Sequence, residues 1–372
     1  MEAKQIFTFQ ARNGMVIAED IYNEQDLLVI SKDSFFTDKT REILIANSII
    51  ELKVYDQKNV NYIDEENLSL ANSLQSKNTT KNTLSKRIKN SPEFKQIEKK
   101  YSEGYDNLKK EITAIIDNKK SLVADDLISI TMDILDHSDS SYHIFDMLHS
   151  LNNYDDSTYS HSLNVSLICS VFADWLHFDY EDKKALMLAG IIHDVGKLQI
   201  PDNIIKKPSK LNEREFRIVQ NHPALGYNIV KDKIDDPRIK SAVLMHHEKC
   251  DGSGYPSGLM ANKIPDFAKI VTIADVYEAM TATRVYRGAL CPFEVIRIFE
   301  DEGFQKYDPK FILTFLSNVC NTYLNNDVEL NDGRIGKIVL INQDALSRPM
   351  ISIDNDCIDL RKNHNLSIVN IL

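Results

Sequence analysis

The segment LAGIIHDVGKLQIP, Leu188 to Pro201, carries ionisable side chains into an apolar stretch. Its apolar residues predict a buried helix. His193 and Asp194 stand side by side in its middle, and Lys197 follows about one turn later. A buried charge is costly unless it is paired or coordinates a metal. The segment therefore indicates a buried polar centre, although a single His-Asp doublet is weak evidence for a metal.

The composition is typical of a globular protein with a sizeable core. Of 372 residues, 43% are hydrophobic and 27% are charged, and the length suggests two or three domains. No apolar run is long enough to cross a bilayer, and the start, MEAKQIFTFQ, lacks the layout of a signal peptide. Five scattered cysteines without a CxxC pair suit a reducing compartment. We therefore expect a cytoplasmic protein with no membrane span and no thiolate zinc site.

The chain is acidic, with a formal net charge of −11. Because an acidic protein repels polyanions, we expect no nucleic-acid polymer among its partners. A small phosphate-containing ligand remains compatible with this charge if basic side chains gather at its binding site.

The first part of the chain predicts a small α+β domain followed by a linker. Residues 1–63 contain strand patterns at 26–30 and 49–55 and a helix pattern at 37–47. We expect this domain to be a regulatory or docking module, because nothing in it looks catalytic. Residues 64–92 are rich in Ser, Asn, Thr and Lys and predict a polar linker.

The remainder predicts a multi-domain α+β protein whose core is all-α. Residues 93–121 carry an amphipathic stripe, which favours packing against the next domain, with a signalling or dimer helix as the alternative. Residues 122–372 form the main domain, helical to about residue 325 and followed by a short β appendage at 328–372. The predicted helices lie at 126–135, 162–176, 184–196, 213–230, 238–247, 270–284 and 293–302, and the predicted strands of the appendage at 336–342, 349–354 and 366–372.

Further ionisable residues stand in core-like sequence of the predicted helices. A lone histidine of this kind is more often a satisfied core residue than a ligand, and we leave His137, His143, His149, His177 and His364 to that interpretation or to the surface. Burying several ionisable groups on different helices costs less if all of them converge on one centre of divalent cations. The candidates are His161, His193, Asp194, His222, His246, His247 and Asp275.

These ligand types narrow the metal and the chemistry. Imidazole and carboxylate without sulfur fit iron, manganese or zinc and disfavour a structural zinc site. Seven ligands suit two octahedral ions better than one tetrahedral ion. Successive helical residues point about 100° apart, so we expect Asp194 to bridge two ions beside His193. Two ions roughly 3.5–4 Å apart activate a shared hydroxide for phosphoester hydrolysis.

Three motifs resemble one known family. HDVGK at 193–197, HHEKCDGSGYP at 246–256 and IADVYEAMTATRVYR at 273–287 are similar to the HD-GYP subgroup of the HD superfamily of metal-dependent phosphohydrolases. The resemblance extends from about Tyr154 to Arg287, and residues 1–63 resemble a small domain found ahead of such modules. It implies an HD-type helical core and hydrolysis of a cyclic dinucleotide, most often cyclic di-GMP, to a linear dinucleotide and possibly on to GMP.

The resemblance assigns roles residue by residue. It implies two divalent ions, iron or manganese, held by the seven candidate ligands, with Asp194 as the bridge. Lys197 would be catalytic and would hold a phosphate oxygen, while Arg284 and Arg287 would bind the rest of the substrate. The alternative for both arginines is a solvated helix end. Tyr255, in the Gly-Tyr-Pro loop, would line the pocket or instead serve loop structure or partner docking.

Some positions depart from the family pattern. Ser157 stands where some members have a glutamate for a third metal, which favours two ions. Val285 replaces a common proline and bears on the direction of Arg284, and Glu278 replaces a common aspartate, a change expected to touch no ligand. These departures leave cyclic di-GMP, a mixed cyclic GMP–AMP and the linear product open as substrates.

Two further interpretations and several partners stay open. One is a catalytically weak receptor that binds the nucleotide and signals through the first domain. Another is an HD hydrolase of other nucleotides, which the Gly-Tyr-Pro loop argues against. The partner predictions are a cyclic dinucleotide, a homodimer, and a signalling protein bound through the first domain or the Gly-Tyr-Pro loop.

Overall fold

The computed structural model divides the chain into two compact units, Met1–Lys81 and Asn82–Leu372, each of which is described by itself. The domain boundaries predicted at 63 and 92 stay predictions, because the linker falls almost wholly outside the described residues. Those residues are 3–7, 11, 15–22, 28–30, 32, 34, 36, 40, 44, 49, 51–55, 92–117, 120–136, 144–145, 147–148, 158–207, 209, 211–282, 289–354 and 356–372.

The first unit contains two small antiparallel strand pairs. Strand β1 (Ala3–Phe7) pairs with β4 (Glu51–Tyr55), and β2 (Ile21–Tyr22) pairs with β3 (Leu28–Ile30). Strands β1 and β2 were not predicted, because each is too short or too mixed in polarity to stand out. Of the predicted helix at 37–47, the two described residues are helical. The small core of the unit contains Ala11, Ile17, Ile21, Phe36, Leu44, Leu52 and Val54.

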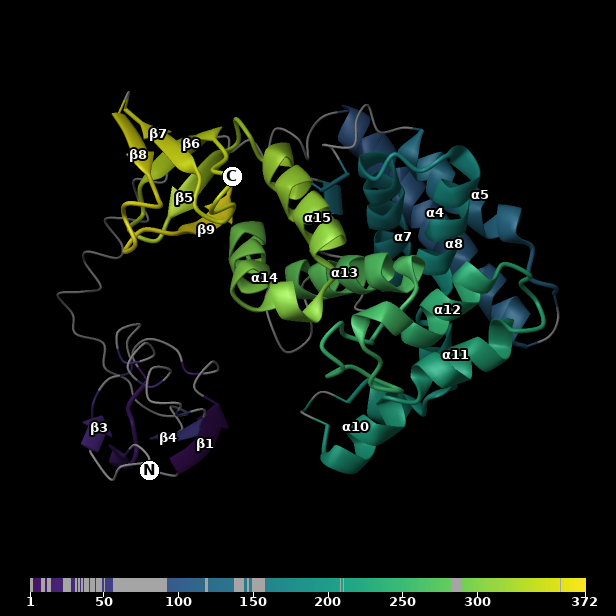
Figure 1. Cartoon of the computed structure of the whole chain (residues 1–372), viewed down its shortest axis with the longest axis horizontal. Coiled ribbons are helices and arrows are strands. Elements are labelled where there is room, and N and C mark those ends of the chain that lie inside the picture. The colour runs from purple at the N-terminus through teal and green to yellow at the C-terminus, as the bar shows by residue number, and fades with distance from the viewer. Residues whose placement is uncertain are drawn as a thin grey trace. The chain divides into compact units, whose positions relative to one another are not determined.

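The second unit is a helical core with a sheet at the end of the chain (Figure 1). Helices α7 and α8 lie side by side and pack against α12 and α13. The longer helices are α4 (Pro92–Ile116), α5 (Ala124–Leu135), α7 (Thr158–Trp175), α8 (Tyr180–Ile192), α10 (Glu213–Val219), α11 (His222–Val230), α12 (Pro237–Met245), α13 (Asp266–Thr281), α14 (Pro292–Lys306) and α15 (Pro309–Thr322), and the short ones are η2 (Val195–Gln199), α9 (Asp202–Ile205) and η3 (Ala261–Lys263).

Local sequence signals explain several helix boundaries. The side chains of Asp236 and Asp308 cap α12 and α15 by accepting a hydrogen bond from a first-turn backbone N–H, and a proline follows each cap. The predicted helix at 213–230 is two helices in the structure, α10 and α11, because Pro223 begins a new helix beside His222. Helix α15 was not predicted, although it follows a clear Asp-Pro start.

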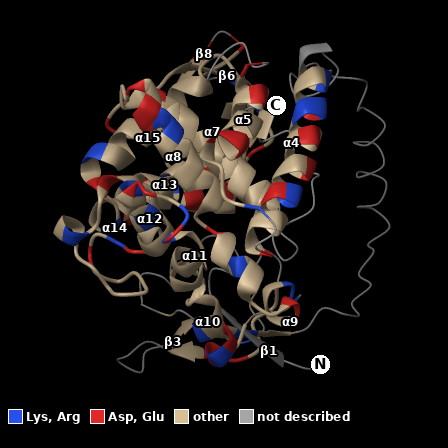
Figure 2. Cartoon of the chain, turned by 90° about the vertical axis from the view of Figure 1, so that its right-hand side faces the viewer, with Lys and Arg blue, Asp and Glu red and all other residues tan. Residues whose placement is uncertain are grey.

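Helix α4 packs one side onto the core and exposes the other. Phe94, Ile97, Tyr101 and Leu108 are buried at spacings of three, four and seven, which matches the periodicity of the amphipathic stripe. Figure 2 shows both acidic and basic residues along the same helix. Among the described residues, no helix is long and apolar enough to cross a membrane.

The chain ends in a five-stranded antiparallel sheet with strand order β8-β7-β6-β5-β9. Val328, Ile338 and Ile351 are completely buried on its inner face. Strands β7 and β9 fall within predicted strands, and β6 begins one residue before its predicted strand. Strands β5 and β8 are short, carry acidic residues and were not predicted. The bounds are β5 (Asp327–Leu330), β6 (Ile335–Leu340), β7 (Met350–Ile353), β8 (Asp356–Asp359) and β9 (Ile368–Ile371).

Candidate metal centre

Five helices bring the candidate ligands to one place within the second unit. Most of the ligands stand at helix ends. Four imidazoles and one carboxylate follow or begin a helix, and the other two ligands lie inside α7 and α13. His161 is in the first turn of α7, His193 and Asp194 follow α8, His222 begins α11, His246 and His247 follow α12, and Asp275 lies in α13.

Asp194 is the shared centre of the cluster. Its Oδ2 lies 3.3 Å from His161 Nε2 and 3.5 Å from His193 Nε2. Its Oδ1 lies 3.1 Å from His222 Nε2 and 3.6 Å from His246 Nε2. Each oxygen therefore faces its own pair of imidazoles, as a carboxylate that bridges two ions would. Two groups of donor atoms that share Asp194 result, one with His161 and His193, the other with His222, His246 and His247.

Asp275 lies beside the same cluster and spans both sides. Its Oδ1 is 3.0 Å from His161 Nε2 and 3.9 Å from His193 Nε2, and its Oδ2 is 3.7 Å from His247 Nδ1. All seven residues predicted as ligands are thus within reach of one another, although they come from stretches up to 114 residues apart.

The backbone at Asp194 corrects one expectation. Helix α8 ends at Ile192, and Asp194 adopts φ −99° and ψ 6°, outside the α-helical region, before the 3₁₀ turn η2 begins. The prediction of one helix through His193 and Asp194 was wrong. The turn lets Gly196 lie against α11, where a Cβ would stand 2.0 Å from the His222 carbonyl oxygen. Glycine is required at this close approach, and the contact brings His222 to Asp194.

Ring orientation is fixed by hydrogen bonds from the nitrogens that face away from the cluster. His193 Nδ1 donates to the Gly190 carbonyl at 2.8 Å, and His222 Nδ1 donates to the Val219 carbonyl at 2.7 Å. His246 Nδ1 lies 3.0 Å from the Val243 carbonyl. These bonds hold each imidazole in the tautomer whose Nε2 lone pair faces the cluster, which is the usual arrangement of a metal-binding histidine.

His161 has a side-chain partner instead. Its Nδ1 donates to Glu278 Oε2 at 2.5 Å, and Asn164 Nδ2 donates to Glu278 Oε1 at 2.8 Å. We had expected the glutamate at 278 to touch no ligand, and its contact with His161 shows that this expectation was wrong. The signal was present in the sequence, since Glu278 stands three residues after Asp275 on one helix and therefore shares its face.

Burial and neighbouring charges set the protonation states. Burial lowers the pKa of His193 to about 3 and also lowers the pKa values of His222 and His247, so these rings are neutral and able to coordinate. Burial alone would lower the pKa of His161, but the carboxylates of Glu278, Asp194 and Asp275 hold it well above its usual value. Metal binding must therefore expel a proton from His161.

The two carboxylates are ionised. Burial would raise the pKa of Asp194, but Lys197 and the surrounding imidazoles hold it well below its usual range. Burial would also raise the pKa of Asp275, but His161 and His247 hold this pKa well below its usual range. The Lys197 ammonium donates a short hydrogen bond to Asp194 Oδ2. Lys197 thus contacts a residue of the candidate metal centre. Its predicted contact with a substrate phosphate stays a prediction.

The cluster fits divalent cations on two observations. Among the described residues, the fully buried Asp194 Oδ1 accepts no hydrogen bond, and such an orphan needs an explanation. The Nε2 atoms of His161 and His193 are 3.2 Å apart, and those of His222 and His246 are 3.1 Å apart. Each pair of nitrogen atoms is therefore close enough to coordinate one cation.

The Gly-Tyr-Pro loop packs against the His246-His247 pair. The Tyr255 ring stacks on the His247 imidazole, with 4.6 Å between ring centroids, and burial raises the pKa of Tyr255. The predicted contact of Tyr255 with a substrate stays a prediction. Gly254 makes a close approach to the chain itself, because a Cβ there would lie 2.4 Å from the Lys249 backbone nitrogen.

Glu248 anchors this loop and was missed by the sequence analysis. It is 2% exposed and accepts hydrogen bonds from the backbone N–H groups of Ser257 at 2.7 Å and Leu259 at 2.8 Å. A buried carboxylate is stable only with such partners. Its position directly after two candidate ligands was the available signal.

Other predicted positions lie outside the described residues. They include Arg284 and Arg287, predicted to bind substrate, and Ser157, on which the expectation of two rather than three ions rested. Of the histidines assigned to the core or the surface, His177 and His364 are exposed, and His137, His143 and His149 are outside the described part.

Comparisons with known proteins agree with the residues of this site. A family model described as HD domain matches residues 142–311. A 3'3'-cGAMP-specific phosphodiesterase of Vibrio cholerae is 39% identical over 145 residues, which are 39% of this chain and 34% of that protein. A cyclic di-GMP phosphodiesterase of Pseudomonas aeruginosa is 32% identical over 205 residues, which are 55% of this chain and 49% of that protein.

This chain spans about half or less of the length of those two relatives. Among solved structures, an HDG"Y"P protein from Bdellovibrio bacteriovorus covers 84% of this chain and 98% of its own at 16% identity, with a TM-score of 0.43, which is too low to carry an argument. The family model, the relatives and the three motifs agree on one assignment. Residues 142–311 match an HD domain, and the motifs within them are similar to those of the HD-GYP family.

Proposed function

We propose that this chain is a metal-dependent phosphodiesterase that hydrolyses a cyclic dinucleotide to a linear dinucleotide. The observation that carries the proposal is the geometry at Asp194, whose two carboxylate oxygens face two separate pairs of imidazoles. A cluster that served only a structural ion would need one group of ligands. Two adjacent groups are the arrangement that phosphoester hydrolysis uses.

The residues of the chain would hold the ions as two groups. His161, His193 and Asp275 would serve one position, and the His222, His246 and His247 imidazoles the other, with Asp194 common to both. Bound iron or manganese would supply activation of a water molecule and neutralisation of charge on the phosphate. Nitrogen and oxygen donors without sulfur suit these metals.

Lys197 is the described basic residue best placed for the phosphate. Its ammonium is bonded to Asp194 Oδ2, and it is the only lysine or arginine among the described residues with an ion pair to a candidate ligand. We propose that Lys197 shares its protons between Asp194 and a phosphate oxygen when substrate is bound. Arg284 and Arg287 are proposed to bind the remainder of the substrate.

Cyclic di-GMP and a mixed cyclic GMP–AMP are the two candidate substrates. The relatives support both, since they include proteins named for each. Both substrates present the same phosphodiester to the metal site and differ in one base, so a base-contacting residue must decide between them. We propose cyclic di-GMP as the preferred substrate and treat the mixed dinucleotide as the alternative.

Turnover of the anaerobically purified chain tests this proposal. The chain is loaded with Fe²⁺ or Mn²⁺ and incubated with cyclic di-GMP or 3′3′-cyclic GMP–AMP, and linear products are separated by chromatography. We expect metal-dependent release of a linear dinucleotide, faster from cyclic di-GMP, and none from His193→Ala. His364→Ala is the matched control, because this histidine is exposed, and it should keep full turnover.

Other outcomes would replace the proposal. A chain that binds the nucleotide and leaves it intact in the presence of bound metal would be a receptor. Equal turnover by His193→Ala and the unmodified chain would remove the metal centre from the mechanism. Preference for the mixed dinucleotide would keep the enzyme class and change only the substrate.

A further inference from the structure

A chain of side-chain hydrogen bonds leads from helix α4 to the candidate metal ligand His161. Tyr101 of α4 donates its hydroxyl proton to Asn164 Oδ1 at 2.6 Å. Asn164 Nδ2 donates to Glu278 Oε1 at 2.8 Å, and His161 Nδ1 donates to Glu278 Oε2 at 2.5 Å. Three helices, α4, α7 and α13, thus contribute one residue or more to a single directed path.

Each donor and acceptor in this path has a defined role. Asn164 and His161 stand three residues apart in α7, and both point toward Glu278 of α13. The carboxylate can accept only, so it requires the amide N–H₂ of Asn164 on one side and the imidazole N–H on the other. The amide orientation is in turn fixed by the Tyr101 hydroxyl, which needs the Asn164 oxygen as its acceptor.

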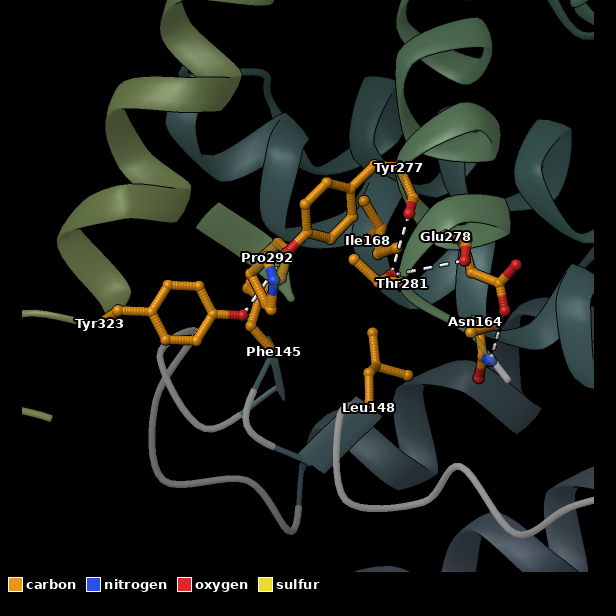
Figure 3. Close-up of a pocket in the computed structure, with 10 residues that line it drawn as sticks. Phe145, Leu148, Asn164, Ile168, Tyr277, Glu278, Thr281, Pro292 and Tyr323 are labelled. Atoms are coloured by element: carbon orange, nitrogen blue, oxygen red, sulfur yellow. Dashed lines mark hydrogen bonds between the residues drawn. The ribbon is translucent and has the colours of Figure 1, made fainter. Parts of the chain in front are cut away.

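Packing alone does not hold Glu278 in place. A cavity of about 20 Å³ adjoins it, lined among others by Asn164, Ile168, Tyr277 and Thr281. Figure 3 shows the Glu278 side chain directed to Asn164 beside this space. The cavity has room for about one water molecule. Because the neighbouring side chains leave this space, hydrogen bonds from Asn164 and His161 define the rotamer of the carboxylate.

Tyr101 is buried and belongs to a long helix. It is 1% exposed and is carried by a helix of 25 residues, α4, which precedes the HD domain in sequence. A displacement of α4 along its axis would carry the hydroxyl away from Asn164. The hydrogen bond to the amide would then be lost before the apolar contacts of the helix are.

We propose that Tyr101 and Asn164 are positioning residues for the metal site. Through Glu278 they orient the His161 imidazole and so raise the affinity of the ion that His161 and His193 hold, which couples that ion to the position of α4. This inference rests on the proposed dimetal function. It concerns only one of the two ions, since His222 and His246 are oriented by backbone carbonyl groups three residues earlier in the chain.

Stepwise Mn²⁺ binding to the whole chain, measured by calorimetry with a competing chelator, tests the proposal. The binding step lost in His161→Ala identifies the ion concerned. We expect Glu278→Gln to weaken that step about 10- to 100-fold, as the loss of an outer partner does. Tyr101→Phe and Asn164→Leu each remove one neutral hydrogen bond and should weaken the same step about 2- to 10-fold.

The matched control is Tyr323→Phe. Tyr323 is also 1% exposed and loses a hydroxyl contact of 3.4 Å with Tyr277 in the same core, but it lies outside the path. This variant should bind both ions as the unmodified chain does. A general loss of stability would weaken both steps alike, so selective weakening of one step separates positioning from a structural role.

Amide hydrogen exchange gives a second readout, because coupling between two sites is reciprocal. Saturating Mn²⁺ should slow exchange in α4 around Tyr101, and the effect should shrink in Tyr101→Phe and persist in Tyr323→Phe. If Asn164→Leu fails to fold, Asn164→Asp keeps the polar position and still removes the donor to Glu278. It should weaken the His161 step by at least as much.

Two failures are distinguishable. If the unmodified chain binds no Mn²⁺ and no Fe²⁺, the proposed metal-dependent function is overturned, and the positioning role falls with it. If the unmodified chain binds two ions and Tyr101→Phe and Asn164→Leu bind both with unchanged affinity, the proposed function stands and the positioning role is overturned.

Discussion

The two sides of Asp194 are built in different ways. On the Oδ1 side, His222 and His246 are oriented by carbonyl groups three residues earlier in the chain, Val219 and Val243. On the Oδ2 side, His193 is oriented in the same local way by the Gly190 carbonyl, but His161 is oriented by Glu278, a residue 117 positions away. One side is thus set by local backbone geometry, whereas the other also depends on how helices pack through His161.

This difference predicts how each side responds to change. A ligand held by a carbonyl group three residues earlier keeps its direction as long as that turn of the backbone is unchanged. A ligand held by a distant carboxylate loses its direction when either helix shifts. We therefore expect the Oδ1 side to be the more robust site and the His161 side to be the more adjustable one.

The largest effect should come from Asp194→Asn, which removes the residue common to both sides. The amide cannot bridge two cations as a carboxylate does, so metal content should fall from about two ions per chain to below one. Turnover should drop by more than the roughly 10- to 100-fold typical of an outer-shell partner. Elemental analysis and a product assay measure the two losses.

Asp202→Asn is the control for this change, because Asp202 is exposed in the short helix α9. It should retain both metal content and turnover. If the Asp194 variant kept full activity and full metal content, Asp194 would not be the ligand common to the two sides, and the comparison would fail.

Gly196→Ala should damage the Oδ1 side selectively. A Cβ at this position would meet the His222 carbonyl oxygen at 2.0 Å, so the start of α11 must move away from Asp194. We expect the free energy of unfolding to fall by about 1–3 kcal/mol and the ion at His222 to be lost before the ion at His161. Thermal unfolding and metal titration measure these effects.

Gly303→Ala is the matched glycine variant. A Cβ there meets its nearest neighbour at 3.5 Å, an ordinary contact, and lies within α14. It should be neutral or stabilise the protein by roughly 0.5–1 kcal/mol. Destabilisation by Gly303→Ala as large as that by Gly196→Ala would argue that any added methyl group is harmful and that the contact with α11 is not special.

Glu248→Gln should loosen the Gly-Tyr-Pro loop and leave both metal groups in place. The carboxylate accepts from two backbone N–H groups, and a hydrogen bond to a charged group contributes about 1.5–3 kcal/mol. Amide exchange at Ser257 and Leu259 should therefore accelerate. Glu213→Gln, at an exposed position of α10, should leave exchange in the loop unchanged. If Glu248→Gln also left exchange at Ser257 and Leu259 as slow as in the unmodified chain, the anchoring role of Glu248 would be contradicted.

The smallest effect should come from Tyr255→Phe. The change keeps the ring that stacks on His247 and removes only the hydroxyl, so turnover should fall by no more than about 10-fold, the worth of one neutral hydrogen bond. Steady-state kinetics measure it. A larger loss would place the hydroxyl in contact with the substrate, and Tyr255→Leu, which removes the stack as well, shows how much the ring contributes.

Many residues of the site could be predicted because each ligand is an ionisable residue in an apolar segment of the sequence. Histidines and aspartates within apolar helix patterns are costly unless they share a partner, and the structure brings all seven predicted ligands together. The course of the backbone was harder to predict. The helix predicted through His193 and Asp194 ends earlier because Gly196 must lie against α11, and periodicity within a single segment contains no information about that neighbour.

The outer partners were missed for a related reason. The positions of Glu278 and Glu248 beside candidate ligands were a signal, but the sequence does not show which donors each carboxylate meets, because those donors lie on other segments. Asn164 and Tyr101 gave no signal of their own either, since an asparagine in an apolar helix and a tyrosine in an amphipathic stripe are both common in packed cores.

The amino-acid sequence by itself determined the donor types and their order along the chain, because the cost of burying an ionisable side chain in an apolar segment depends only on residues nearby. Only the tertiary structure decided which imidazoles share each oxygen of Asp194 and that Glu278 orients His161. The physical reason is range: helix periodicity and capping act over three or four residues, whereas the pairing of side chains 117 positions apart depends on how whole helices pack.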